Sequence, residues 1–398
     1  ATLPPCPFRA PPMSYSAAPL WLVGFRPFFA LACLAGLSLP TVWVLILAGV
    51  LPPPAAPYGP VQWHAHEMFY GFGWAVLGGF LLTASKNWVN VRGYHGPTLM
   101  LLAGAWILER LALALGGTWP PVLFFVASNV FLGALVVLLA ATLIRHRATD
   151  SYRDNGFFLL ILPLFLLAKN LLLDPDHFAS GWSLTLALFR VAFLIMLERT
   201  LTPFMQGAFQ VRLLRWPPLD RAIKGLAALL LLDRILPPGV SGLLALALAL
   251  LLSGRLLLWK PWVALGRLEI GVMYGGYLAL VVQLVLQALA AFGHPVGIGS
   301  VAVHVFTLGA MGLVIPAMIV RIAKGHTGRK VVFDGGDRAV LWIMVGAFAA
   351  RVVLPQLAPA AYLPALHLAA TCWLAAFATL AWRYIPFLLA PRVDGREH

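Results

Sequence analysis

Residues 63–73 read WHAHEMFYGFG and stand at the mouth of an apolar run that continues through Ala84. Two imidazoles and a carboxylate, those of His64, His66 and Glu67, therefore meet the edge of a segment long enough to enter a membrane. Ionisable groups in such a place are costly to remove from water, so they need partners, a metal ion or water. We expect those partners to lie on other helices of the same kind.

The composition indicates a membrane protein. Hydrophobic residues make up 61% of the 398 residues and charged residues only 11%, far from the average soluble domain. Apolar runs long enough to cross about 30 Å of hydrocarbon recur along the chain, and they are continuous instead of alternating with period two. The predicted fold class is all-α: a polytopic membrane protein embedded in the lipid bilayer, of about twelve transmembrane helices.

Proline and glycine clusters separate the predicted spans. A single transmembrane domain is predicted over residues 28–389, between a cytoplasmic N-terminal tail, 1–27, and a cytoplasmic C-terminal tail, 390–398. The span at 221–236 is the shortest and contains Asp233 and Arg234. The twelve predicted spans are 28–50, 66–84, 97–115, 121–144, 155–173, 182–203, 221–236, 239–258, 270–292, 297–320, 338–357 and 361–389.

The basic residues predict the orientation. Most of the 28 lysines and arginines fall in the tails and in alternate loops, whereas the opposite loops near 51–65, 116–120, 174–181, 293–296 and 358–360 have none. Basic residues favour the cytoplasmic side, so both termini are predicted to lie inside the cell. The same rule explains the net charge of +14 without any nucleic acid partner. The three cysteines lie too far apart to indicate a disulfide framework or an iron–sulfur motif.

This orientation places four histidines at a similar depth. The second, tenth and twelfth spans all begin on the outer side, which brings His64, His66, His304 and His367 into the outer half of the membrane. Imidazoles within apolar spans suit haem iron or copper, and the nearby Met311 and Met318 offer thioethers as soft secondary ligands or as simple packing. The alternative is that these histidines bond to loops and water at the interface.

The spacing within residues 63–73 leaves two arrangements open. On an ideal helix residues two apart point about 200° apart, so His64 and His66 cannot share a face. Either one histidine faces the bundle while the other caps the helix, or the first turn is irregular and both converge. Glu67 shares a face with His64 and is predicted to be the catalytic proton carrier or a further ligand. A tight turn near His326 is interpreted as structural.

Several blocks taken in order resemble one family over nearly the whole chain. They are Gly24–Phe29, Trp63–Met68 with Gly71 and Phe72, Gly79–Ala84, Asn87 with Trp88, His304 with Gly309–Gly312, Arg321 with Gly325–Arg329, and Pro391–Arg396. This pattern is similar to the NnrS family. The chain departs from it at Met273–Tyr277, where a histidine is expected, and whether Tyr274 takes part in a site stays open.

The resemblance implies a twelve-span protein of the bacterial inner membrane, associated with haem and copper and with the response to nitric oxide. The leading hypothesis is reduction of nitric oxide at a metal held by His64 or His66 with His304, and with His367 as a further ligand. It requires an electron donor that the sequence does not identify. The alternatives are binding or sensing of nitric oxide or a metal without turnover and, ranked last, secondary transport.

Overall fold

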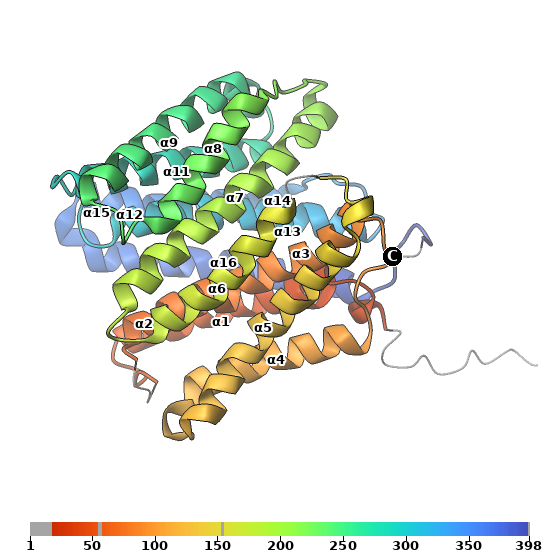
Figure 1. The fold of residues 1–398 in the computed structure, drawn as a ribbon, viewed down its shortest axis with the longest axis horizontal. Helices are drawn as coiled ribbons and strands as arrows, with labels where there is room; N and C mark the ends of the chain where they lie inside the picture. The colour runs from red at the N-terminus through yellow and green to blue at the C-terminus, as the bar shows by residue number, and fades with distance from the viewer. Residues whose placement is uncertain (1–17, 55–57, 153–154, 397–398) are drawn as a thin grey trace, which may run out of the picture.

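The computed structural model describes residues 18–54, 58–152 and 155–396, and every regular element in those ranges is a helix (Figure 1). The all-α fold class predicted from the composition is confirmed. Residues 1–17 of the predicted N-terminal tail lie outside the described ranges. Of its remainder, Pro19–Trp21 form a short 3₁₀ turn, and the first long helix already begins at Phe25.

Eleven helices in the described ranges are long and apolar enough to cross a membrane. Each corresponds to one predicted span, with ends that differ by a few residues. In chain order they are α1 (Phe25–Leu47), Pro60–Trp88, Pro97–Thr118 with α4 (Pro97–Leu115), α5 (Pro121–Arg145), α6 (Gly156–Leu173), α7 (Phe178–Phe209), α9 (Pro238–Leu258), α11 (Leu268–Ala291), Val301–His326, Gly335–Leu357, and Pro359–Leu389 with α16 (Tyr362–Leu389).

The predicted span at 221–236 is a shorter element. Helix α8 (Pro217–Leu229) and one 3₁₀ turn (Leu230–Leu232) occupy this stretch and pack against α9 and α7. Thirteen residues at 1.5 Å each give a helix of about 20 Å, which is less than the hydrocarbon thickness of about 30 Å. The count of twelve crossings and the orientation of the termini therefore stay predictions.

Proline sets the beginning of several helices, because its fixed φ suits the first turn and its missing N–H has no partner to lose there. Pro97, Pro121 and Pro238 each begin a spanning helix. Pro60 does the same for the helix predicted to begin at 66. His64 and His66 thus lie one to two turns inside the helix, and of the two arrangements left open by the spacing, the irregular first turn is not observed.

The first and last spanning helices pack tightly along each other. A Cβ built on Gly36 of α1 would lie 2.4 Å from Cδ1 of Phe377 in α16, so only glycine permits this approach. The indole N–H of Trp373 donates to the Gly36 carbonyl at 2.8 Å across the same contact. At the other end of this helix pair, Arg26 donates hydrogen bonds to the carbonyls of Leu388 and Ala390, at 2.8 and 2.7 Å. It caps the end of α16, as arginines at span ends commonly do.

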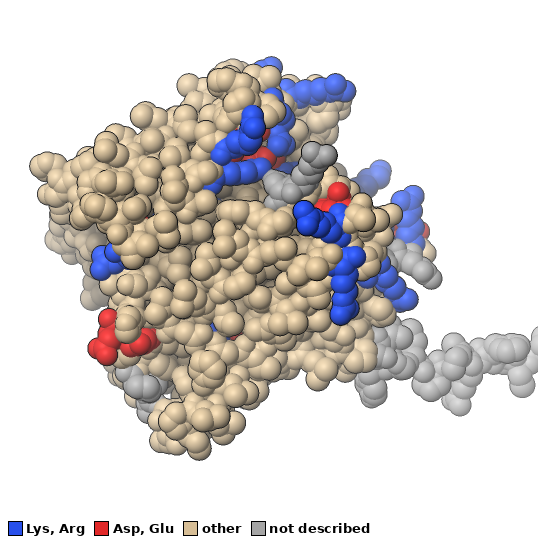
Figure 2. All heavy atoms as spheres, viewed as in Figure 1, with Lys and Arg blue, Asp and Glu red and all other residues tan. Residues whose placement is uncertain are grey.

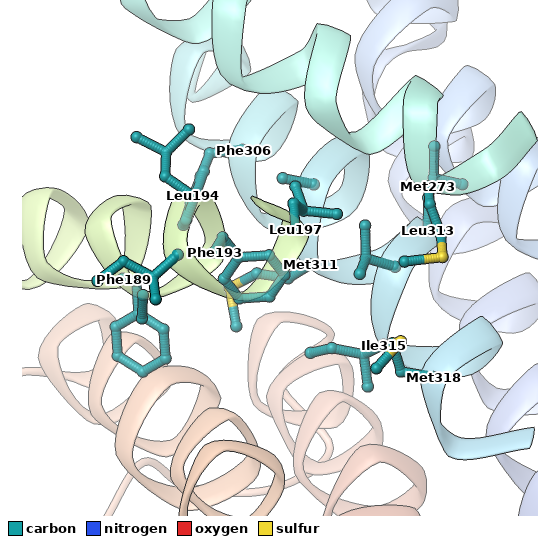
Figure 3. Close-up of a cluster of buried hydrophobic side chains, with 14 of the residues drawn as sticks. Phe189, Phe193, Leu194, Leu197, Met273, Phe306, Met311, Leu313, Ile315 and Met318 are labelled. Carbon is teal, nitrogen blue, oxygen red and sulfur yellow. The ribbon is translucent and has the colours of Figure 1, made fainter. Parts of the chain in front are cut away.

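The middle of the bundle is filled by large apolar side chains. Figure 3 shows Phe193, Leu194 and Leu197 of α7 beside residues of the Val301–His326 helix, with Met273 of α11 nearby. Phe193 and Phe306 meet edge to face, with ring centroids 6.0 Å apart. These contacts hold α7 and α11 against the helix that carries His304.

Charged side chains are distributed unevenly over the surface. In the view of Figure 2, lysines and arginines gather mostly over the end of the bundle near which the C-terminus lies in Figure 1. The wide surface between the two ends is apolar, as a surface in contact with lipid requires. This asymmetry is what the positive-inside rule would produce for a C-terminus inside the cell.

The packing of α1 on α16 gives a test of the fold. Replacing Gly36 by alanine should lower the free energy of unfolding by about 1–3 kcal/mol, because the new methyl group must displace Phe377. The measurement is thermal unfolding of the purified protein in detergent. Gly133→Ala in α5 is the matched control, since a Cβ there meets nothing within 4 Å and stability should be unchanged or raised. Equal behaviour of the two variants would contradict the contact.

Candidate functional site

His64 and His66 face opposite sides of one helix. The Pro60–Trp88 helix consists of α2 (Pro60–His66), a π-helical segment η3 (Glu67–Gly73) and α3 (Trp74–Trp88). Since α2 is regular, its two histidines point about 200° apart. His64 lines a large cavity, whereas His66 is fully buried on the other side in a network of charged groups. They do not converge on one site.

The cavity has a volume of about 610 Å³ and opens toward the apolar surface of the bundle. Its walls are largely aliphatic and aromatic, with Trp43, Trp182 and Trp373 on three different helices. Leu47, Val61 and Leu363 lie at its edge and are 46%, 57% and 58% exposed. The polar residues among those that line it are His64, Ser300, His304, Thr307, Arg351 and Tyr362.

His304 lines the same cavity from another helix, Val301–His326. This helix consists of α12 (Val301–His304), a π-helical segment η8 (Val305–Met311) and α13 (Gly312–His326). Nδ1 of His304 lies 2.9 Å from the carbonyl oxygen of Ser300, which can only accept, so Nδ1 carries the proton. Nε2 then keeps its lone pair, which is the state in which an imidazole binds a metal.

His64 is oriented by an aromatic neighbour. Its ring stacks on Trp43 of α1, with centroids 4.3 Å apart and planes 12° apart. The stack fixes the plane of the imidazole. His64 and His304 are thus the two imidazoles that the structure brings to one cavity. They are two of the four histidines that were predicted to lie at a similar depth in the membrane.

Three π-helical segments surround the cavity. Each contributes lining residues: Met68, Phe69 and Phe72 from η3, Thr307, Leu308 and Met311 from η8, and Arg351 from η9 (Ala349–Val353). The segment η9 lies between α14 (Gly335–Phe348) and α15 (Leu354–Leu357). A π-helical turn changes the direction of the side chains that follow it and occurs frequently at functional sites. Here these turns aim polar and sulfur-bearing side chains at one space.

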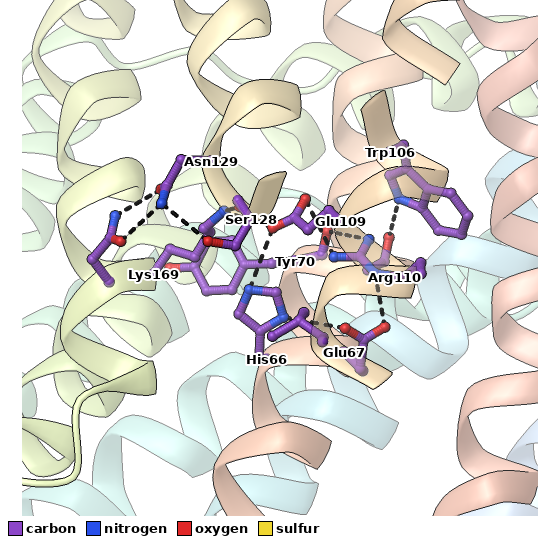
Figure 4. Close-up of polar contacts among 12 residues, drawn as sticks. His66, Glu67, Tyr70, Trp106, Glu109, Arg110, Ser128, Asn129 and Lys169 are labelled. Atoms are coloured by element: carbon purple, nitrogen blue, oxygen red, sulfur yellow. Dashed lines mark hydrogen bonds and ion pairs between the residues drawn. The ribbon is translucent and has the colours of Figure 1, made fainter. Parts of the chain in front are cut away.

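The network around His66 is a closed set of ion pairs (Figure 4). His66 lies between two carboxylates, with Nδ1 3.3 Å from Glu67 and Nε2 3.5 Å from Glu109. Arg110 pairs with both carboxylates, at 2.9 Å to Glu67 and 3.3 Å to Glu109. Lys169 donates to Glu109 at 2.6 Å. Two acidic and two basic groups therefore cancel inside the bundle, which limits the cost of burying them.

Sequence reasoning missed the role of Glu109, Arg110 and Lys169. The signal was present: a Glu-Arg pair and a lone lysine stand inside predicted spans, where charged residues are rare and are usually paired or functional. Glu67 belongs to this network and does not line the cavity.

The remaining predicted residues lie elsewhere. His367 is half-buried on α16, and the cavity wall contains Leu366 and Ala370 but not His367. Met311 reaches the cavity, whereas Met318 packs in the core. The rings of His326 and Phe25 have centroids 5.3 Å apart at the other end of the molecule, which agrees with a structural role for His326.

Tyr274 also makes a structural contact. Its hydroxyl donates to the Trp259 carbonyl at 2.7 Å. No group of three or more His, Cys, Asp or Glu side chains in the described ranges is placed to hold a metal ion. A metal between His64 and His304 would therefore draw its other ligands from thioethers or from bound molecules.

The ion-pair network gives a second test. Lys169→Met leaves Glu109 with one cation fewer, and breaking a buried pair from one side typically costs about 3–5 kcal/mol of stability. Lys169→Met combined with Glu109→Gln restores the charge balance and should recover more than half of that loss. Thermal unfolding in detergent measures both. If the double variant is less stable than the single one, the two residues do not act as a pair.

Comparison with known proteins agrees with the resemblance of the sequence blocks. No protein with a curated description matches the chain. The family model described as NnrS protein matches residues 19–392, which is nearly all of the sequence. This match includes every polar residue that lines the cavity, from His64 in α2 to Tyr362 in α16. The chain belongs to the NnrS protein family.

Proposed function

We propose that this multi-pass membrane protein of the nitric oxide response binds a transition metal through His64 and His304 and acts on nitric oxide there. The observation that carries the proposal is the pair of imidazoles that line one largely apolar cavity. The hydrogen bond from His304 Nδ1 to Ser300 supports it, because metal-binding histidines usually donate their second nitrogen to a carbonyl or carboxylate. The family supports the link to nitric oxide.

The donor set fits iron or copper. Neutral imidazoles and the thioethers of Met68 and Met311 are ligands for borderline and soft metals, whereas no lining residue in the described ranges offers the carboxylates that Mg²⁺ or Ca²⁺ prefers. A volume of about 610 Å³ is also large enough for a metal inside an organic macrocycle, such as haem. When bound, such a metal would bind nitric oxide and pass electrons to it from an external donor.

The surroundings favour an apolar diatomic substrate. The cavity opens among exposed aliphatic side chains, so a lipid-soluble gas can reach the histidines through the hydrocarbon of the inner membrane. Joining two nitric oxide molecules into nitrous oxide and water consumes two electrons and two protons. The electrons come from a donor outside this chain. In this proposal Glu67 carries protons from the ion-pair network and is not a ligand in the cavity.

Binding without turnover is the second candidate. The observation that favours it is the position of Glu67, whose carboxylate pairs with Arg110 at 2.9 Å and does not reach the cavity. A protein that captures nitric oxide on a metal needs the two imidazoles but no route for protons.

Metal content tests the site. His304→Ala or His64→Ala should reduce the bound iron and copper to background, because each removes one of the two imidazoles of the cavity. Elemental analysis and an optical spectrum of the purified protein provide the measurement. His367→Ala is the matched control and should retain the wild-type metal content, since His367 does not line the cavity. Full metal content in both cavity variants would disprove the assignment.

Turnover separates the two candidates. Metal-loaded protein given a chemical reductant and nitric oxide should produce many equivalents of nitrous oxide if it is a reductase, and the Glu67→Gln variant should be slower. Gas chromatography of the headspace gives the amount. Nitric oxide binding, seen as a spectral change, with less than one equivalent of nitrous oxide would establish the binding function instead.

A further inference from the structure

Arg351 is the one residue with a full positive charge among the described residues that line the cavity, and none of them is acidic. Its side chain is only 7% exposed, and it lies inside a spanning helix. Its Nη2 donates to two neutral oxygens, Ser300 Oγ at 2.8 Å and Tyr362 Oη at 3.3 Å. In the described ranges no carboxylate forms an ion pair with it.

Several other buried cations of the bundle pair directly with carboxylates, although Arg190 bonds to the neutral amide oxygen of Gln287. Arg110 and Lys169 pair with Glu67 and Glu109 as described above, and Arg255 lies 3.3 Å from Glu198 and 3.4 Å from Asp220. Lys324 pairs with Asp337 in the same way. A buried charge without a partner is strongly unfavourable in an apolar medium. Arg351 therefore differs from the paired cations by facing an open cavity in place of an acid.

The shape and lining of the cavity restrict what could balance this charge. A volume of about 610 Å³ is far larger than a single small ion needs, and most of the wall is aliphatic or aromatic. At its edge lie Leu47, Val61 and Leu363, which are exposed aliphatic side chains in the first or last turn of their helices. A ligand that uses the whole site has an apolar body against the tryptophans and one negative group beside Arg351.

We propose that the cavity binds an amphiphilic anion from the bilayer, namely a molecule with a long apolar body and one carboxylate that pairs with Arg351. Tyr362 and Ser300 hold the guanidinium in place from the side, which leaves its remaining N–H groups for the ligand. The hydroxyl of Ser300 also lies 3.0 Å from Nδ1 of His304. An anion beside Arg351 would therefore be linked to His304 through Ser300. The inference goes beyond the proposed metal function and does not require it.

The test uses tryptophan fluorescence, since Trp43, Trp182 and Trp373 lie in the cavity wall. Chelator-treated protein in detergent is titrated with dibrominated stearate, whose bromines quench nearby indoles, and in parallel with its uncharged methyl ester. The wild type should bind the acid about tenfold more tightly than the ester, since a charge-assisted hydrogen bond contributes at least about that factor. Metal-free protein keeps this result separate from the success or failure of the metal site.

Substitutions of Arg351 test whether this residue causes the preference for the acid over the ester. Arg351→Gln should remove the preference for the acid, whereas Arg351→Lys should keep part of it. Arg190→Gln is the matched control, because Arg190 is also buried in the bundle but does not line the cavity, and it should behave as the wild type. Equal binding of acid and ester by the wild type would overturn the proposal, as would an unchanged preference in Arg351→Gln. Acetate that competes as well as stearate would show a small-anion site and overturn the amphiphilic ligand.

Discussion

The cost of placing charge inside an apolar bundle governs the interior of this protein. In the His66 network, Glu67 and Glu109 are matched by Arg110 and Lys169, so the four full charges sum to zero. On another part of the bundle, Glu198 and Asp220 pair with Arg255 and also with Arg215, and Glu198 pairs with Lys224. Because the members of each set come from different helices, the ion pairs constrain the relative positions of α2, α4 and α6, and of α7, α8 and α9. Breaking one member leaves the others uncompensated, which makes each set a strong constraint on packing.

The same constraint makes the cavity unusual. Its two histidines are neutral donors, so they can line an apolar space at little cost, but Arg351 cannot. The three π-helical turns that meet there replace the regular helical pattern at the points where these side chains turn inward. The cavity thus contains two imidazoles, those of His64 and His304, and the guanidinium of Arg351, which is held by two neutral hydroxyls. A charged or polarisable ligand would complete this arrangement.

The separation of His64 from His66 divides the protein into two chemical regions. One helix carries both residues, yet His64 belongs to the cavity and His66 to the ion-pair network. Glu67 belongs to the same ion-pair network as His66. Any coupling between proton movement in the network and chemistry in the cavity must therefore pass along this single turn of α2. This arrangement limits direct contact between the carboxylates and a ligand beside His304.

The sequence by itself determined the class of fold and the positions of eleven spanning helices, because apolar runs and proline boundaries are local properties of the chain. It also determined that His64 and His66 cannot share a helix face, since that follows from helical geometry alone. Only the tertiary structure decided which of the two histidines lines the cavity together with His304. That choice depends on the rotation of α2 against α1 and α12, where Trp43 stacks on His64. Only the tertiary structure showed which partners Glu109, Lys169 and Arg351 have, because pairing between residues up to 60 positions apart arises from helix packing and leaves no local pattern.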